Sequence, residues 1–135
     1  ILLRFANGVI GTFILSDTAA SACSWEQTAQ ENKAYSTYPD EDCYHIAGTM
    51  GSLSVPTMRL KTFSNEASRS WYEPLICDQI ALKRDDPLTV QLQHFCQVIR
   101  GEVDPLVSVR DGLQNLKITE AILEAAKSEQ LVRID

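Results

Sequence analysis

Long hydrophobic runs are missing from this 135-residue sequence. Its most apolar region, residues 1–15, is interrupted by Arg4, Asn7 and Gly8, whereas a membrane-spanning helix needs about 20 consecutive apolar residues. An excess of positive charge is missing too, because 18 acidic residues outnumber 12 basic ones and no run of Lys or Arg breaks this balance. The net charge of -6 repels polyphosphates. We therefore expect a soluble protein that binds neither membranes nor nucleic acid.

The sequence also lacks the common cofactor and metal motifs. Its 6 glycines form no GxGxxG pattern, and none opens a predicted helix in a phosphate-binding turn. Its 4 cysteines are widely spaced without a CxxC pair, which argues against a zinc ribbon or a redox motif. Because a chain of this length can build a core without cross-links, we expect reduced thiols and a cytoplasmic location.

Signatures of catalysis are equally scarce. No serine lies in a GxSxG pattern, and only His45 and His94 could act as a general base near neutral pH. His94 lies beside the apolar stripe of a predicted helix, which favours a packing role. His45 could join Asp40 and Asp42 in the metal site of a hydrolase, but the solvated beginning of a strand explains these residues more simply. The sequence therefore predicts no catalytic residue and no metal ligand.

The composition that is present, 44% hydrophobic and 22% charged, is typical of one globular domain. Residues 4–15 predict a hairpin, with Asn7 and Gly8 as the centre of a type I′ turn. Alternation along its second strand leaves apolar side chains on both faces, so we expect cover on both sides. Residues 16–42 are polar and irregular, which indicates a loop that holds at most one strand.

The middle of the chain predicts a sheet. Residues 43–47 and 52–56 flank a glycine-containing turn and indicate a second hairpin, and residues 58–63 and 71–82 are further candidate strands. A last short strand is predicted at residues 131–134.

The spacing of apolar residues changes to that of helices in the last third of the chain, where two amphipathic helices are predicted. Residues 86–100 begin with an N-cap aspartate and stop at Gly101, and residues 108–126 begin with a capping box and carry apolar stripes on two sides. We therefore expect an α+β fold, with an open, largely antiparallel β-sheet, helices packed on one face and the other face available for association.

Aromatic and hydrogen-bonding side chains gather in the polar region before the second hairpin. Rings offer flat apolar faces and carboxylates or amides bind hydroxyls, so this composition suits a sugar or polyol site. The alternative is that Trp25 and Tyr38 only anchor a long loop to the sheet. The candidate substrate-binding residues are Trp25, Glu26, Asn32, Tyr35 and Tyr38.

Five sequence blocks in order resemble the C-terminal domain of the Gfo/Idh/MocA family, which includes glucose-fructose oxidoreductase and inositol dehydrogenase. The blocks are FANGVIGT at 5–12, SWE at 24–26, IAGTMGSL at 46–53, HFCQVIRG at 94–101 and PLVSVRDGL at 105–113. The resemblance implies that residues 1–135 are a C-terminal substrate-binding and oligomerisation domain. It also implies that the N-terminal Rossmann domain, which binds NAD or NADP, is absent from this chain.

The resemblance further implies a function for the parent protein. The family's catalytic lysine and its Asp-x-x-x-His pair lie upstream of the first block, so no catalytic or cofactor-binding residue is transferred to this chain. The expected partners are the Rossmann domain, a small sugar-like or polyol substrate with a secondary alcohol, and further copies in a homodimer or tetramer associating through the sheet face. The chain alone is expected to be inactive. The alternative is a free-standing binding or scaffold module that has lost its catalytic half.

Overall fold

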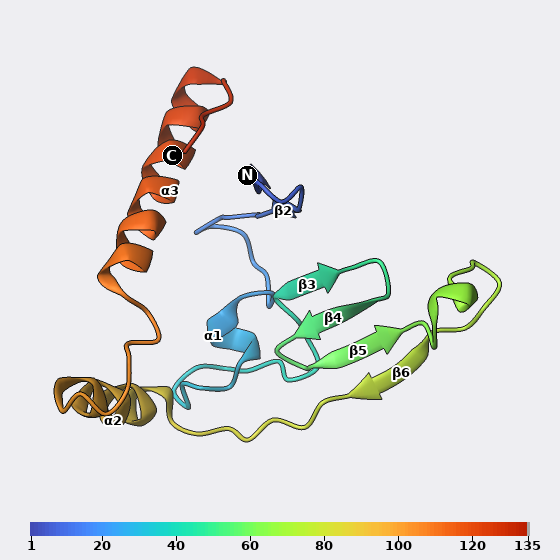
Figure 1. Ribbon diagram of the computed structural model, residues 1–135, viewed down its shortest axis with the longest axis horizontal. Coiled ribbons are helices and arrows are strands. Elements are labelled where there is room, and N and C mark those ends of the chain that lie inside the picture. Colours follow the sequence, from blue (N-terminus) through green and yellow to red (C-terminus); the bar gives the residue numbers. More distant parts are fainter. Residues whose placement is uncertain (135) are drawn as a thin grey trace. The chain divides into compact units, whose positions relative to one another are not determined.

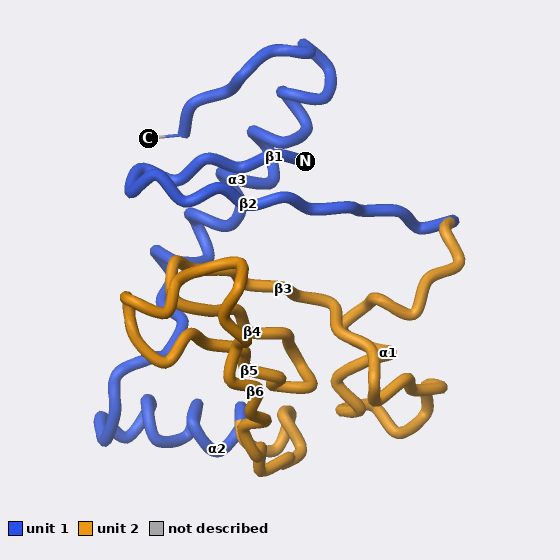
Figure 2. Tube along the Cα trace, turned by 90° about the vertical axis from the view of Figure 1, so that its right-hand side faces the viewer, with its two compact units in different colours: residues 1–18, 91–135 blue, residues 19–90 orange. Residues whose placement is uncertain are grey.

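The computed structural model describes residues 1–134 and divides the chain into two compact units (Figure 2). Unit 2 comprises residues 19–90, and unit 1 comprises residues 1–18 together with residues 91–135. Strands and helices are both present, and the strands pair only in antiparallel fashion within residues 1–134. The predicted α+β class is therefore confirmed.

Unit 2 contains an open sheet of four antiparallel strands in consecutive order (Figure 1). The strands are β3 (Tyr44–Ala47), β4 (Gly51–Val55), β5 (Arg59–Thr62) and β6 (Ile76–Gln79). They confirm the second hairpin and both further strand predictions. A short 3₁₀ helix, η1 (Glu66–Ser68), interrupts the connection between β5 and β6.

The strand register gives this sheet one apolar face and one polar face. Leu53 lies opposite Ile46 on one side and Leu60 on the other, so side chains of the same kind gather on one surface. The residues on the apolar face include Tyr44, Ile46, Leu53, Val55, Leu60 and Ile76, and those on the polar face include His45, Ser52, Ser54, Arg59, Lys61 and Gln79. The predicted packing of helices on one face of this sheet depends on how the two units lie against each other, so it stays a prediction.

The first hairpin, β1 (Leu2–Arg4) with β2 (Ile10–Thr12), has a different turn from the predicted one. The amide of Gly8 donates to the carbonyl of Phe5 at 2.9 Å, and Gly8 alone in the turn has a positive φ, at 88°. The type I′ prediction is wrong, because Asn7 does not adopt a left-handed conformation. Its side-chain oxygen instead accepts a bond from the amide of Val9 at 3.1 Å, which favours a three-residue loop closed by glycine.

Helix α2 (Pro87–Ile99) forms as predicted. Asp86 accepts a bond from the amide of Leu88 at 3.0 Å, and the proline at the first helical position needs no partner for its nitrogen. Gly101 has a φ of 71°, a conformation that ends the helix at low steric cost.

Helix α3 (Val109–Ser128) also forms, and its capping box is confirmed. The Ser108 hydroxyl accepts a bond from the amide of Asp111, and the Asp111 carboxylate accepts one in return from the amide of Ser108. The helix ends at Glu129, which adopts a left-handed conformation.

The polar region before β3 is largely loop as predicted, and one predicted strand, at residues 131–134, is wrong. Residues 16–42 contain no strand; they hold instead the one-turn helix α1 (Trp25–Thr28), which begins because the Ser24 hydroxyl accepts a bond from the amide of Gln27. Residues 131–134 are irregular and belong to neither described sheet, and a short apolar run forms a strand only where another strand pairs with it.

Very little apolar surface is buried within residues 1–134. Ala29 is the one buried hydrophobic residue of the described core, and α2 and α3 contain no buried side chain. Ile118 and Ile122 of α3 are half-buried within the described residues, whereas Leu113 on the opposite side is 55% exposed. Burial of α3 on two sides depends on cover from outside its own unit and stays a prediction. No helix within residues 1–134 combines the length and the hydropathy needed to cross a bilayer.

Candidate functional site

The predicted substrate residues lie in one stretch of unit 2, the aromatic segment (residues 25–38). It begins with Trp25 in α1, whose indole nitrogen donates to the Glu31 carboxylate at 2.9 Å. The ring centroids of Trp25 and Tyr44 are 5.9 Å apart, which ties the indole to the first strand of the sheet. Trp25 is nevertheless 37% exposed, so part of its ring surface remains accessible to a ligand although Tyr44 and Glu31 contact the indole.

The other candidate side chains are also accessible. Glu26 lies in the first turn of α1 and is exposed. Tyr35 and Tyr38 are about half exposed. Asn32 uses its side-chain oxygen locally, since that oxygen accepts a bond from the amide of Ala34 at 3.0 Å and thereby shapes a turn.

The aromatic segment closes on itself through its backbone. The amide of Tyr38 donates to the carbonyl of Gln27 at 2.7 Å, which brings the end of the segment back to α1. A shallow pocket of about 280 Å³ lies elsewhere in unit 2 and includes none of the five candidate residues. Its lining residues are Pro56, Thr57, Gln79, Ile80, Ala81, Leu82 and Arg84.

Asp42, which lies two residues before β3, is a buried carboxylate of unit 2. Its side chain is 1% exposed, and its two oxygens accept bonds from the amide of Thr57 at 2.9 Å and from Arg59 Nη2 at 2.6 Å. Burial alone raises the pKa of this carboxyl, but the hydrogen bonds from Thr57 and the Arg59 guanidinium together outweigh burial and hold the pKa below its usual value. Asp42 is therefore a charged structural anchor.

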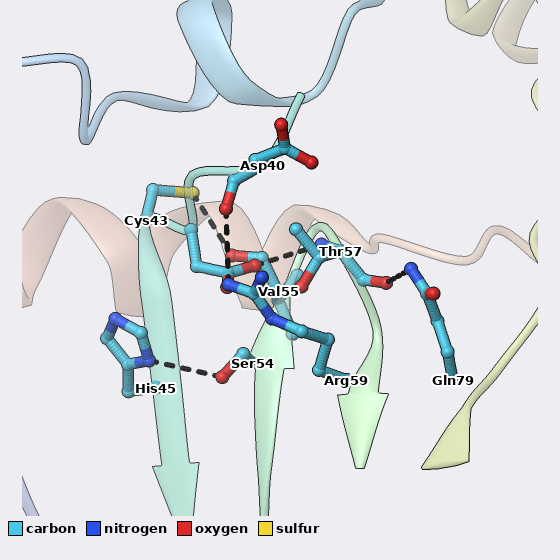
Figure 3. A network of polar contacts seen from close by, with 9 residues as sticks. Asp40, Cys43, His45, Ser54, Val55, Thr57, Arg59 and Gln79 are labelled. Carbon is cyan, nitrogen blue, oxygen red and sulfur yellow. Dashed lines mark hydrogen bonds and ion pairs between the residues drawn. The ribbon is translucent and has the colours of Figure 1, made fainter. Parts of the chain in front are cut away.

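The network continues along the turn between β4 and β5. Arg59 Nη2 also donates to the carbonyl oxygen of Asp40 at 3.2 Å, and Gln79 donates to the carbonyl oxygen of Thr57 at 3.0 Å (Figure 3). Met58, between these positions, has a φ of 57°, and the Thr57 hydroxyl is buried without a hydrogen-bond partner. The side chains of Asp42 and Gln79 therefore fix the backbone of this turn at Thr57.

The metal site considered around Asp40, Asp42 and His45 does not form. Both oxygens of Asp42 are used by Thr57 and Arg59, and His45 faces the Ser54 hydroxyl across the β3–β4 pair at 3.3 Å. No group of three His, Cys, Asp or Glu residues in the described part of the chain could hold a metal ion. All four cysteines are free thiols.

A comparison with protein-family models matches residues 1–134 to the Gfo/Idh/MocA oxidoreductase family, C-terminal alpha/beta domain. The chain belongs to this family. The match extends over both units, which confirms the resemblance seen in the five sequence blocks. The family is NAD(P)-dependent, and its C-terminal domain normally pairs with a Rossmann domain. No curated protein and no solved structure matches the chain.

The residues of this chain do not fit the family's dinucleotide. Backbone amides at a helix N-terminus bind the pyrophosphate in dinucleotide sites. Each long helix instead has a carboxylate of the chain itself in its N-terminal cap: Asp86 accepts a bond from the amide of Leu88 in α2, and Asp111 accepts one from the amide of Ser108, the N-cap of α3. Hydrogen bonding in these caps holds the pKa of both carboxyls below the usual value, so each remains charged and repels a phosphate.

Sequence reasoning missed the partnership of Asp42 with Arg59. The two residues are 17 positions apart, and only the register of the strands between them brings their side chains together. The available signal was the acidic stretch 40–42 before one strand and a single arginine at the start of another, which is compatible with many pairings.

Proposed function

We propose that this chain is the substrate-binding and oligomerisation domain of an NAD(P)-dependent oxidoreductase that acts on a secondary alcohol of a sugar, a polyol or a related hydroxy compound. Family membership supports the reaction class. The observation that carries the substrate assignment is that Trp25, Tyr35 and Tyr38 keep exposed ring surface while the backbone around them is hydrogen-bonded. Exposed rings beside a carboxylate are suited to stack on a sugar and accept bonds from its hydroxyls.

In this proposal the chain binds and orients the substrate. The apolar face of a sugar or polyol lies against Trp25, and the Glu26 carboxylate accepts hydrogen bonds from hydroxyl groups. The partner Rossmann domain supplies the dinucleotide and the proton-transfer residues. The chain alone is inactive because it lacks both.

Association of copies is the second part of the proposed function. Tyr44, Ile46 and Ile76 on the apolar face of the four-stranded sheet are each about half exposed. Contiguous apolar surface of this kind is unusual on a monomer and typical of an interface. We propose that this face lies against a second copy in a homodimer or tetramer.

The two tryptophans of the chain provide a matched test of the substrate assignment. Trp25 lies in the aromatic segment, whereas Trp71 lies outside it and is fully exposed. In the full-length protein that carries this domain, Trp25→Ala is expected to lower kcat/KM about tenfold or more for the sugar or polyol oxidised fastest, because a stacking surface is lost.

Trp71→Ala is expected to leave kcat/KM unchanged, and thermal unfolding of both variants shows how much protein is folded. Unchanged kinetics in a folded Trp25→Ala enzyme would remove the substrate role of Trp25 and leave the anchoring role alone.

A further inference from the structure

Two arginine side chains hold the backbone near the two ends of the aromatic segment. We propose that Arg59 and Arg84, together with Asp42, are positioning residues for the substrate, because they fix the segment so that its exposed side chains present one surface. This inference rests on the proposed function and names the groups that make its binding surface rigid.

The contact at the beginning of the segment is made by Arg84. Its guanidinium donates to the carbonyl oxygen of Ala29, the residue that follows α1. Thr28 and Ala29 are among the most buried residues of the chain, at 0% and 4% exposure, so the arginine meets the best-packed point of the segment. The next residue, Gln30, has a φ of 59°, which turns the chain away from α1 at this point.

The contact at the end of the segment is made by Arg59. One nitrogen, Nη2, donates both to the Asp42 carboxylate at 2.6 Å and to the carbonyl oxygen of Asp40 at 3.2 Å (Figure 3). Asp42 is itself fixed by the amide of Thr57 at 2.9 Å. The backbone that leaves the aromatic segment is therefore attached to the turn between β4 and β5.

Between these two contacts the segment relies on hydrogen bonds rather than on packing. Residues 31–41 are all exposed, and the amides of Tyr38 and Glu41 donate to the carbonyls of Gln27 and Tyr38. A segment without buried side chains gains little order from the hydrophobic effect. Its ends must therefore be held by directional contacts, and charged hydrogen bonds are the strongest of these.

Lysine could not replace arginine in this role. The guanidinium carries five donors in a rigid plane, whereas the lysine ammonium is a flexible point charge. Arg59→Lys therefore keeps the attraction to Asp42 but loses the defined contact with the carbonyl of Asp40. This difference separates positioning from simple charge neutralisation.

The first measurement reads the order of the segment without activity. In a Trp71→Phe background, Trp25 is the single fluorescent tryptophan, and acrylamide quenching reports its accessibility. We expect Arg59→Gln and Arg84→Gln to raise the quenching rate constant about twofold, since 37% exposure leaves room for an increase. The control Lys61→Gln lies on the same face of β5 as Arg59, and the control Lys83→Gln removes only an exposed ion pair with Asp85; both are expected to leave quenching unchanged.

The second measurement is the kinetics of the full-length enzyme. We expect Arg59→Gln and Arg84→Gln to raise KM for the substrate about tenfold with kcat changed less than twofold, because a charge-assisted contact that orders the binding surface is lost. Arg59→Lys is expected to restore the unfolding midpoint but not KM.

The outcomes distinguish this inference from the proposed function. A lower unfolding midpoint with unchanged Trp25 quenching would overturn the positioning role and leave the arginines as stabilising residues. Increased quenching with unchanged KM would overturn the link to substrate. If Trp25→Ala has no kinetic effect, the proposed function fails, and the quenching result still decides whether the two arginines order the segment.

Discussion

At Asp42, burial and hydrogen bonding act on the same carboxyl in opposite directions. Burial raises its pKa, and the bonds from Thr57 and Arg59 lower it by a greater amount. A carboxyl whose folded pKa lies below its unfolded value of about 3.9 adds stability above that value and loses it as the pH falls through the folded pKa. Asp42 therefore couples acid stability to the contact that fixes the turn between β4 and β5.

We predict that Asp42→Asn lowers the free energy of unfolding by a constant amount between neutral pH and about pH 5, because the carboxylate is fully ionised there. Below about pH 4 the difference between the parent chain and the variant is expected to shrink. Urea unfolding over a pH series measures it. A difference that grows toward acid pH would show that the native state does not favour the ionised carboxyl.

The candidate site could be predicted from the sequence only in part. Trp25 and Tyr38 are candidates because aromatic residues stand out in a polar stretch of sequence, and their contact with substrate stays a prediction. The prediction that Asn32 contacts substrate stays a prediction, with its side-chain oxygen occupied by the amide of Ala34. Arg84 and Ala29 were not found, because a contact between residues 55 positions apart depends on how two loops lie in space.

The helices and the central strands were predictable because their signals are local. A cap, a stop residue and a constant period lie within each helix, as at Asp86 and Gly101 for α2. The turn of the first hairpin was mispredicted because an asparagine can stabilise a turn in two ways. It can adopt a positive φ, or its side-chain oxygen can accept a backbone hydrogen bond, as Asn7 does from the amide of Val9. The prediction of a strand at residues 131–134 was wrong, because a strand needs a pairing partner and the sequence of the segment itself does not specify one.

The two glycines of the β3–β4 turn, Gly48 and Gly51, allow a test of how closely β4 approaches β5. A Cβ at Gly51 would overlap the carbonyl oxygen of Lys61 on β5, and this backbone atom can move only with the strand. At Gly48 the nearest atom to such a Cβ is 3.7 Å away, which is an ordinary contact. We predict that Gly51→Ala lowers the free energy of unfolding by about 1–3 kcal/mol, as other overpacking substitutions do, and that Gly48→Ala costs less.

Urea unfolding of the two glycine variants, under the same buffer conditions, checks this prediction. Equal stability of the Gly51→Ala and Gly48→Ala chains would contradict the close approach of β4 to β5 at this position.

On the scale of the whole molecule, the balance between apolar content and apolar burial is unusual. The chain is 44% hydrophobic, yet Ala29 is the one buried hydrophobic residue of the described core. Folding a domain of this size has a large entropic cost that burial of apolar surface normally offsets. The exposed stripes of α2 and α3 and the apolar face of the sheet therefore call for cover from outside the unit to which each belongs.

We predict that the chain associates at tens of micromolar concentration through the apolar face of its four-stranded sheet. Sedimentation equilibrium is expected to give a dimer or larger species. Ile46→Thr, which keeps a β-branched residue on the apolar face, is expected to weaken association, whereas Lys61→Thr on the polar face is not. A clean monomer in the unsubstituted chain would contradict the proposed interface.

Calorimetric titration with NAD(H) and NADP(H) tests the central claim, that this chain is the substrate half of a two-domain oxidoreductase. The isolated chain is predicted to show no binding heat at micromolar dinucleotide, because the carboxylates of Asp86 and Asp111 lie in the N-terminal caps of its two long helices and repel phosphate. The full-length protein that joins it to a Rossmann domain is predicted to bind the dinucleotide and to reduce it with a sugar or polyol as donor. Micromolar binding by the isolated chain, or a full-length protein that binds no dinucleotide, would contradict the account.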